Sequence, residues 1–180
     1  MENPVRSVTT SGSGLRQRAI GVAGALALTL LAGCGFHLRG GQTLPFNSLY
    51  VDAPATSAFA LQMKRVVGNS SQTKVVSAAK DAEAVLQVQA EAREKEILSL
   101  SGTGRVREYQ LRYRLTYRVL DGKNVELLPS SQLLLRRDIS FSDDAALAKE
   151  SEEALLFRDM QSDAVQQLMR RLAAAPAAAK

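Results

Sequence analysis

The chain has 180 residues, with 23 lysines and arginines against 18 aspartates and glutamates, and a formal net charge of +5. Hydrophobic residues make up 46% of it, which is typical of a globular domain and not of a disordered chain. The single cysteine excludes an intramolecular disulfide and cysteine-rich metal sites, and the single histidine excludes paired-histidine zinc chemistry. The basic balance favours an anionic partner, either nucleic acid or a membrane surface.

Residues 1–34 have the pattern of a bacterial lipoprotein signal peptide. Arg16 and Arg18 precede an uncharged apolar run over residues 19–31, which fits a signal-peptide core and is short for a membrane span. The run ends in the lipobox Leu31-Ala32-Gly33-Cys34, a branched apolar residue, two small ones and a cysteine. A short buried helix followed by a core cysteine is the alternative. We expect residues 1–33 to be cleaved off as a signal peptide.

Cleavage leaves Cys34 at the new N-terminus, where we expect a diacylglyceryl group and an N-acyl chain, with no other cofactor. More than one acyl chain gives stable membrane anchoring. Gly35 follows the cysteine, and the absence of an aspartate there permits delivery to the outer membrane. An exported lipoprotein rarely meets nucleic acid, so the expected partner is not nucleic acid. Residues 34–43 read as a lipidated tether.

The first predicted strand covers residues 44–53 and ends at Pro54. Thr56 or Ser57 is expected to cap a following helix that stops at Gly68-Asn69. Residues 73–77 form a short apolar stretch, either a small strand or a lead-in.

Period-two alternation then predicts a strand over residues 82–100, although its alanine, glutamate and glutamine content also suits a helix. The small and aliphatic residues, from Ala82 to Ala92, share one face, and charged residues such as Glu91 and Arg93 mostly share the other. Residues 101–104 form a turn.

Residues 105–120 have the cleanest alternation in the chain, with an aromatic and aliphatic face opposite a face of arginines. After a turn at Asp121-Gly122, a last strand spans residues 132–141. Residues 142–144, Ser-Asp-Asp, open a final helix with a wide apolar stripe, and residues 173–180 form an alanine-rich tail.

This element order predicts an α+β domain over residues 44–172. Consecutive long strands joined by short turns should be antiparallel neighbours, and both helices need an apolar surface to cover. We therefore expect two helices on one face of a mostly antiparallel, mixed four-stranded sheet. The other face of the sheet should carry the arginines.

Signals for catalysis are poor. The only histidine, His37, lies three residues after the lipidated cysteine and outside the domain, so no serine–histidine or cysteine–histidine arrangement can form inside the fold. A hydrolase that uses carboxylates alone is the remaining enzymatic alternative. We expect no catalytic residues, no metal site and no enzyme.

The basic side chains are more informative. We expect four arginines to make one strand face that meets a ligand or a barrel: Arg112, Arg114, Arg118 and Arg136. Arg105 and Arg107 flank a hairpin tip, and Lys149 begins the last helix. Arginine makes bidentate, charge-assisted bonds to phosphate, and the abundant phosphorylated ligand of an outer membrane is lipopolysaccharide. The alternatives are a solvated polar face and a face packed inside a protein partner.

Three segments resemble one known family. Lipobox Cys34 continues as Gly-Phe-His-Leu-Arg, residues 108–110 read Glu-Tyr-Gln, and residues 146–150 read Ala-Leu-Ala-Lys-Glu. In this order they resemble the LptE family of lipopolysaccharide-assembly lipoproteins. The resemblance covers roughly residues 35–172.

The resemblance implies two helices on a mostly four-stranded sheet and a partner, the outer-membrane barrel LptD, whose lumen the domain plugs. It also implies roles in assembling that barrel and in binding and inserting lipopolysaccharide. Lys149 aligns with a basic residue of the family's ligand site, whereas Gly102 stands where the family has its other basic contact. Arg105 or Arg107 is expected to substitute. The alternative is an envelope scaffold or lipid carrier that is not housed in a barrel.

Overall fold

The computed structural model describes residues 43–70 and 72–177. The predicted signal peptide, the lipobox with Cys34 and all but the last residue of the tether lie outside the described residues. The chain order of the elements is β1 (Ser48–Asp52), α2 (Ala58–Ser70), β2 (Lys74–Val75), β3 (Ala84–Leu100), β4 (Val106–Asp121), β5 (Glu126–Ser140) and α3 (Ala146–Ala173). Short 3₁₀ turns at Ala79–Asp81 and Asp143–Ala145 precede β3 and α3.

The strands form one mixed sheet in the order β2-β1-β3-β4-β5. β1 runs parallel to both β2 and β3, and the β3–β4 and β4–β5 pairs are antiparallel. The expected α+β architecture is therefore confirmed, but the expected count of four strands is wrong, because the sheet has five. The extra strand, β2, lies within residues 73–77 and is the small strand that the sequence left open there as one of two alternatives.

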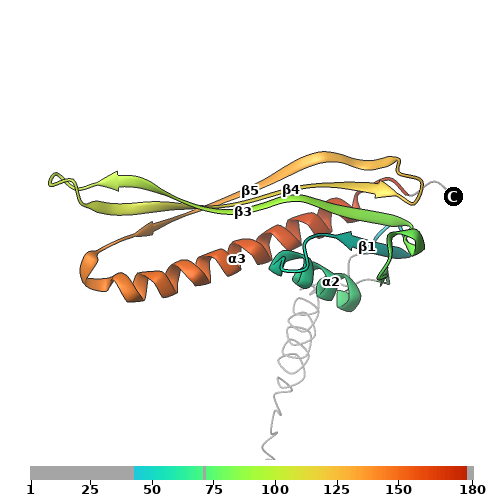
Figure 1. Ribbon diagram of the computed structural model, residues 1–180, viewed down its shortest axis with the longest axis horizontal. Helices are drawn as coiled ribbons and strands as arrows, with labels where there is room; N and C mark the ends of the chain where they lie inside the picture. The colour runs from blue at the N-terminus through green and yellow to red at the C-terminus, as the bar shows by residue number, and fades with distance from the viewer. Residues whose placement is uncertain (1–42, 71, 178–180) are drawn as a thin grey trace, which may run out of the picture. The chain divides into compact units, whose positions relative to one another are not determined.

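Both helices cover the same face of the sheet (Figure 1), with α2 against β1 and β2 and α3 against β4 and β5. The predicted apolar face of β4 is confirmed, since its alternate residues from Leu111 to Val119 are at most 1% exposed. The stripe of α3 packs on it through residues that are fully buried: Met160, Ala164, Val165, Leu168 and Leu172. Burying each large side chain contributes about 1.5–3 kcal/mol.

A β-bulge in β3 reverses which residues face the helices. Val88 pairs with Tyr117, but Ala90 pairs with Thr116, so Gln89 is the extra residue in the strand. The expectation that Ala90 shares the buried face with Ala84 is wrong, because one extra residue moves the side chains that follow it to the opposite face, here as far as the next register shift after Ile97. Glu91 and Arg93 therefore face the helices, and the even-numbered residues from Ala90 to Glu96 face away.

Several boundaries also differ from expectation. β1 begins at Ser48 and α2 continues through Gly68-Asn69 to Ser70. β5 begins at Glu126 and contains Pro129, which an edge strand tolerates because the missing N–H is not needed for a further neighbour. α3 begins at Ala146, after a 3₁₀ turn, and Ser142 makes no capping bond with its side chain. The predicted cap of α2 is confirmed, with the Ser57 hydroxyl accepting from the Ala60 N–H at 3.1 Å.

Candidate functional site

Arg112, Arg114 and Arg118 of β4 lie on the sheet face opposite the helices, and each of the three has a partner there. Arg112 forms an ion pair with Glu96 at 2.7 Å, and Arg114 forms one with Glu94 at 2.9 Å. Arg118 donates to the side-chain oxygen of Gln87 at 2.7 Å, and it lies 4.0 Å from the carboxylate of Glu126. We call this set the arginine ladder. Its charges are largely balanced within the sheet, so the ladder is not an open anion site.

Arg136 differs from these three. It pairs in register with Arg112 across the β4–β5 ladder, and among the described residues its side chain has no ion-pair partner. Two like charges directly opposite each other repel, and the Arg112–Glu96 ion pair offsets that repulsion. Contact of the arginine ladder and Arg136 with a ligand or a barrel stays a prediction.

The structure brings the other three predicted basic residues to one end of the sheet. The Lys149 ammonium donates to the Ser140 hydroxyl at 3.0 Å and to Glu152 at 2.8 Å, and its side chain is only 22% exposed. Arg105 lies 3.8 Å from Asp143, and the Arg107 carbonyl accepts from the Phe141 N–H at 2.7 Å. The β3–β4 hairpin and the β5–α3 connection therefore meet here. We call Arg105, Arg107 and Lys149 the cationic end.

Apolar side chains accompany the cationic end, and sequence reasoning missed them. Ile97, Leu98 and Leu100 at the hairpin tip are 58%, 48% and 55% exposed, and Leu147 in the first turn of α3 is 79% exposed. The signal was present as apolar residues that continue past the covered part of β3. Exposed apolar groups next to cations suit a ligand that has both anionic groups and hydrocarbon.

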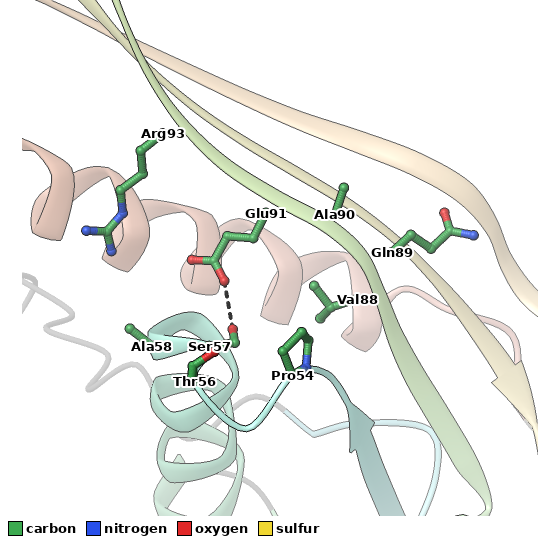
Figure 2. Close-up of a pocket in the computed structure, with 9 residues that line it drawn as sticks. All are labelled: Pro54, Thr56, Ser57, Ala58, Val88, Gln89, Ala90, Glu91 and Arg93. Atoms are coloured by element: carbon green, nitrogen blue, oxygen red, sulfur yellow. Dashed lines mark hydrogen bonds between the residues drawn. The ribbon is translucent and has the colours of Figure 1, made fainter.

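The bulge also creates a polar seam between the sheet and the helices. The Glu91 carboxylate accepts from the Tyr113 and Ser57 hydroxyls, both at 2.7 Å. Arg93 donates to the side-chain oxygen of Gln161 at 2.8 Å, and its guanidinium lies 5.8 Å from the centre of the Phe157 ring. Figure 2 shows Glu91 pointing from β3 towards Ser57 at the start of α2. These bonds satisfy polar groups that the bulge turned inward.

The buried hydroxyl of Tyr113 makes the stability of the fold depend on pH in the alkaline range. Burial, and next the hydrogen bond to Glu91, raise the pKa of the Tyr113 hydroxyl far above its ordinary value. A tyrosine in the unfolded chain loses its proton near pH 10 whereas the folded one keeps it, so stability falls as the pH rises above about 10. The loss of unfolding free energy should approach about 1.4 kcal/mol per pH unit.

The Tyr113→Phe variant tests this assignment by urea unfolding at a series of pH values. It should be less stable than the natural protein at pH 7 but should lose less stability between pH 10 and 11. Equal slopes for the two proteins would contradict this assignment.

Metal chemistry and a membrane-spanning helix find no support in the described part of the chain. Within residues 43–70 and 72–177, no three histidine, cysteine or carboxylate side chains gather closely enough to hold a metal ion. No helix in those residues is long and apolar enough to cross a bilayer. The chemistry that the cationic end and its neighbours offer is that of cations beside exposed apolar groups, which suit the anionic and hydrocarbon parts of a ligand.

The fold defines a two-layer α+β protein, with two helices on one face of a mixed five-stranded sheet. Residues 46–172 match the family model described as LptE, lipopolysaccharide-assembly. A protein of Pectobacterium atrosepticum named LPS-assembly lipoprotein LptE is 31% identical over 171 residues, which cover 88% of this chain and 86% of that protein. The chain therefore belongs to the LptE family, whose members are non-enzymatic lipopolysaccharide-assembly lipoproteins, as the sequence resemblance predicted.

Solved structures agree with this assignment. The solution structure of lipoprotein B from Nitrosomonas europaea superposes with a TM-score of 0.69 at 45% sequence identity, covering 78% of this chain and 91% of that one. The crystal structure of rare lipoprotein B from Shewanella oneidensis gives a TM-score of 0.61 at 27% identity, covering 71% and 95%. Both are similar to this chain along nearly their whole length.

Proposed function

We propose that the chain is a lipid-anchored outer-membrane protein that plugs the LptD barrel, helps to assemble it, and binds lipopolysaccharide for insertion into the outer leaflet. The anchor is Cys34, the domain lies in the barrel lumen on the periplasmic side, and the cationic end meets the ligand. Membership of the LptE family and the lipoprotein names of its relatives support the anchor and the assembly role.

The observation that carries the ligand assignment is the composition of the cationic end. Lipopolysaccharide has phosphates and acyl chains, and this end combines Lys149 and Arg105 with exposed Leu100 and Leu147. On Lys149, phosphate would replace Glu152 and exchange one charge-assisted hydrogen bond for another; on Arg105, it would replace the longer 3.8 Å ion pair with Asp143. The arginine ladder, by contrast, has partners already and is the weaker candidate.

Co-purification tests the barrel assignment. The full-length lipoprotein, extracted from outer membranes in mild detergent, should carry one barrel protein in a one-to-one ratio, quantified by mass spectrometry. A Cys34→Ala variant, which cannot be lipidated, should lose the anchor and yield less complex. Recovery of the native chain alone would contradict the plug.

A further inference from the structure

Most of β3 is an open sheet edge. Of the seventeen residues of β3, only the four from Ala84 to Gln87 pair with β1. From Val88 to Leu100, no strand of the described residues lies on the side of β3 away from β4 (Figure 1). An open edge presents unpaired N–H and C=O groups that can pair with another chain. We call residues 88–100 the open edge.

The register shows which backbone groups face outward. The Arg107 carbonyl bonds to β5, so the odd-numbered residues of β4 point their backbone groups at β5 and the even-numbered ones at β3. Ala92 and Glu94 lie opposite Arg114 and Arg112, so their backbone groups bond to β4. Between the two register shifts of β3, alternation gives outward-facing backbone groups to the odd-numbered residues Glu91, Arg93, Lys95 and Ile97.

Two clefts lie along this edge on the helix side. One, of about 580 Å³, is lined by the start of α2 and by β3 from Val88 to Arg93 (Figure 2). The other, of about 480 Å³, is lined by Arg93 and Lys95 of β3 and by residues 150–158 of α3. Arg93 belongs to both clefts, so together they follow the open edge from α2 to α3. A strand edge beside a cleft that follows it is the arrangement by which several domains bind an extended peptide.

We propose that an extended segment of the barrel partner adds to the sheet as a strand, paired with residues 91–97 of β3. This inference rests on the proposed function, because the barrel supplies the occupant. Regularly repeated donors and acceptors at strand spacing are matched by a polypeptide backbone and not by an acyl chain or a sugar phosphate. Polar groups at the edge that lose water on docking would be satisfied only by such a partner.

The charged residues along the open edge indicate which kind of side chain the partner segment carries. On the helix side, Glu91 already accepts two hydroxyl bonds and Lys95 is paired with Glu153 at 2.6 Å. Arg93 and Arg158 have no carboxylate partner among the described residues, although both line the second cleft. Glu150 lines the same cleft and is its one carboxylate without an ion-pair partner among the described residues, so two unpaired cations stand against one unpaired anion. The segment should therefore place an acidic side chain over these two arginines. On the other face it meets Ala90 and Ala92, which leave room for a large side chain.

Hydrogen exchange tests the pairing in the natural protein. The complex extracted from outer membranes is compared with the purified lipoprotein alone, with exchange resolved to single amides by fragmentation mass spectrometry. Exchange at Arg93 and Lys95 should slow at least tenfold in the complex, whereas Ala92 and Glu94, already bonded to β4, should change little. A complex that contains the barrel but leaves Arg93 and Lys95 unprotected would overturn the edge inference and leave the proposed function standing. Absence of the barrel would overturn both, and protection in a complex of this chain alone would indicate self-pairing instead.

A matched pair of variants separates the contribution of the backbone hydrogen bond at residue 93 from the contribution of its side chain. Arg93→Ala and Arg93→Pro both lose the guanidinium, but only proline also loses the outward N–H, which an edge strand tolerates. Arg93→Pro should recover at least threefold less barrel than Arg93→Ala, with both variants checked for native unfolding midpoints. Equal recovery from two folded variants would overturn the inference. If Arg93→Pro does not fold, the exchange measurement decides alone.

Discussion

Replacing Lys149 and Arg105 together by aspartate should weaken capture of lipopolysaccharide by at least about tenfold. A bond between a charged group and its partner contributes about 1.5–3 kcal/mol, and 1.4 kcal/mol corresponds to tenfold in affinity. Lys149, whose side chain is 22% exposed, should supply most of the loss, because water screens an exposed charge such as Arg105, at 77%. Capture is measured with labelled lipopolysaccharide on the purified full-length lipoprotein.

The matched control reverses two charges far from the cationic end. Lys64 lies on α2, and Lys80 lies in the 3₁₀ turn before β3, and both are exposed. α2 meets α3 at Ser162, thirteen residues after Lys149, which is about 20 Å at 1.5 Å per residue. Lys64→Asp with Lys80→Asp changes net charge equally and should leave capture within twofold of the natural protein. Equal losses in the two double variants would mean that net charge, and not this site, governs binding.

Leu168→Ala should cost about 2–5 kcal/mol of unfolding free energy, because it opens a cavity where α3 meets the sheet. Leu168 is fully buried among the apolar side chains of β4 and α3. The cost should appear as a lower urea midpoint with an unchanged slope.

Leu155→Ala is the control for that loss, since it makes the same substitution in the same helix at a side chain that is 56% exposed. Its effect should stay within about 0.5 kcal/mol, as for surface substitutions generally. Similar effects at Leu155 and Leu168 would contradict the placement of the α3 stripe on the sheet.

The strand and helix pattern could be predicted where one face is buried and the other is wet. β4 shows this, because it is central and covered by α3 on one side. The extra residues at the register shifts beside Leu111–Val119 lie in β3 and β5, so the alternation of β4 is unbroken there. The sequence predicts β3 as a strand, but it does not predict which residues of β3 face the helices beyond the bulge. Alanine suits either face, so Ala90 and Ala92 gave no sign of the extra residue at Gln89.

That bulge decides the chemistry of both faces. Without it, Glu94 and Glu96 would face the helices and could not pair with Arg114 and Arg112. The arginine ladder could therefore be predicted as a row of cations but not as a row of ion pairs. For the same reason, the hydrogen bond from Tyr113 to Glu91 could not be predicted from the sequence.

The cationic end depends on contacts between distant parts of the chain. The sequence places Arg105 beside a hairpin tip and Lys149 at the start of the last helix, and the family resemblance implies a ligand role for Lys149. The structure adds that the hairpin tip and the strand–helix connection meet. No local sequence pattern predicts this contact, because it depends on the register of β3, β4 and β5 together. The exposed leucines and isoleucine at the same end could be assigned to it only once that register was known.

Protection from protease in intact outer membranes tests the central claim, that the domain lies inside a barrel, most directly. Membranes are opened on the periplasmic side and digested, with and without prior depletion of the barrel, and the cleavage of residues 44–172 is followed over time. The proposal requires the domain to resist digestion while the barrel is present and to be cut rapidly once the barrel is removed. Equal digestion in both membranes would contradict it and favour a lipoprotein that stands free of any barrel.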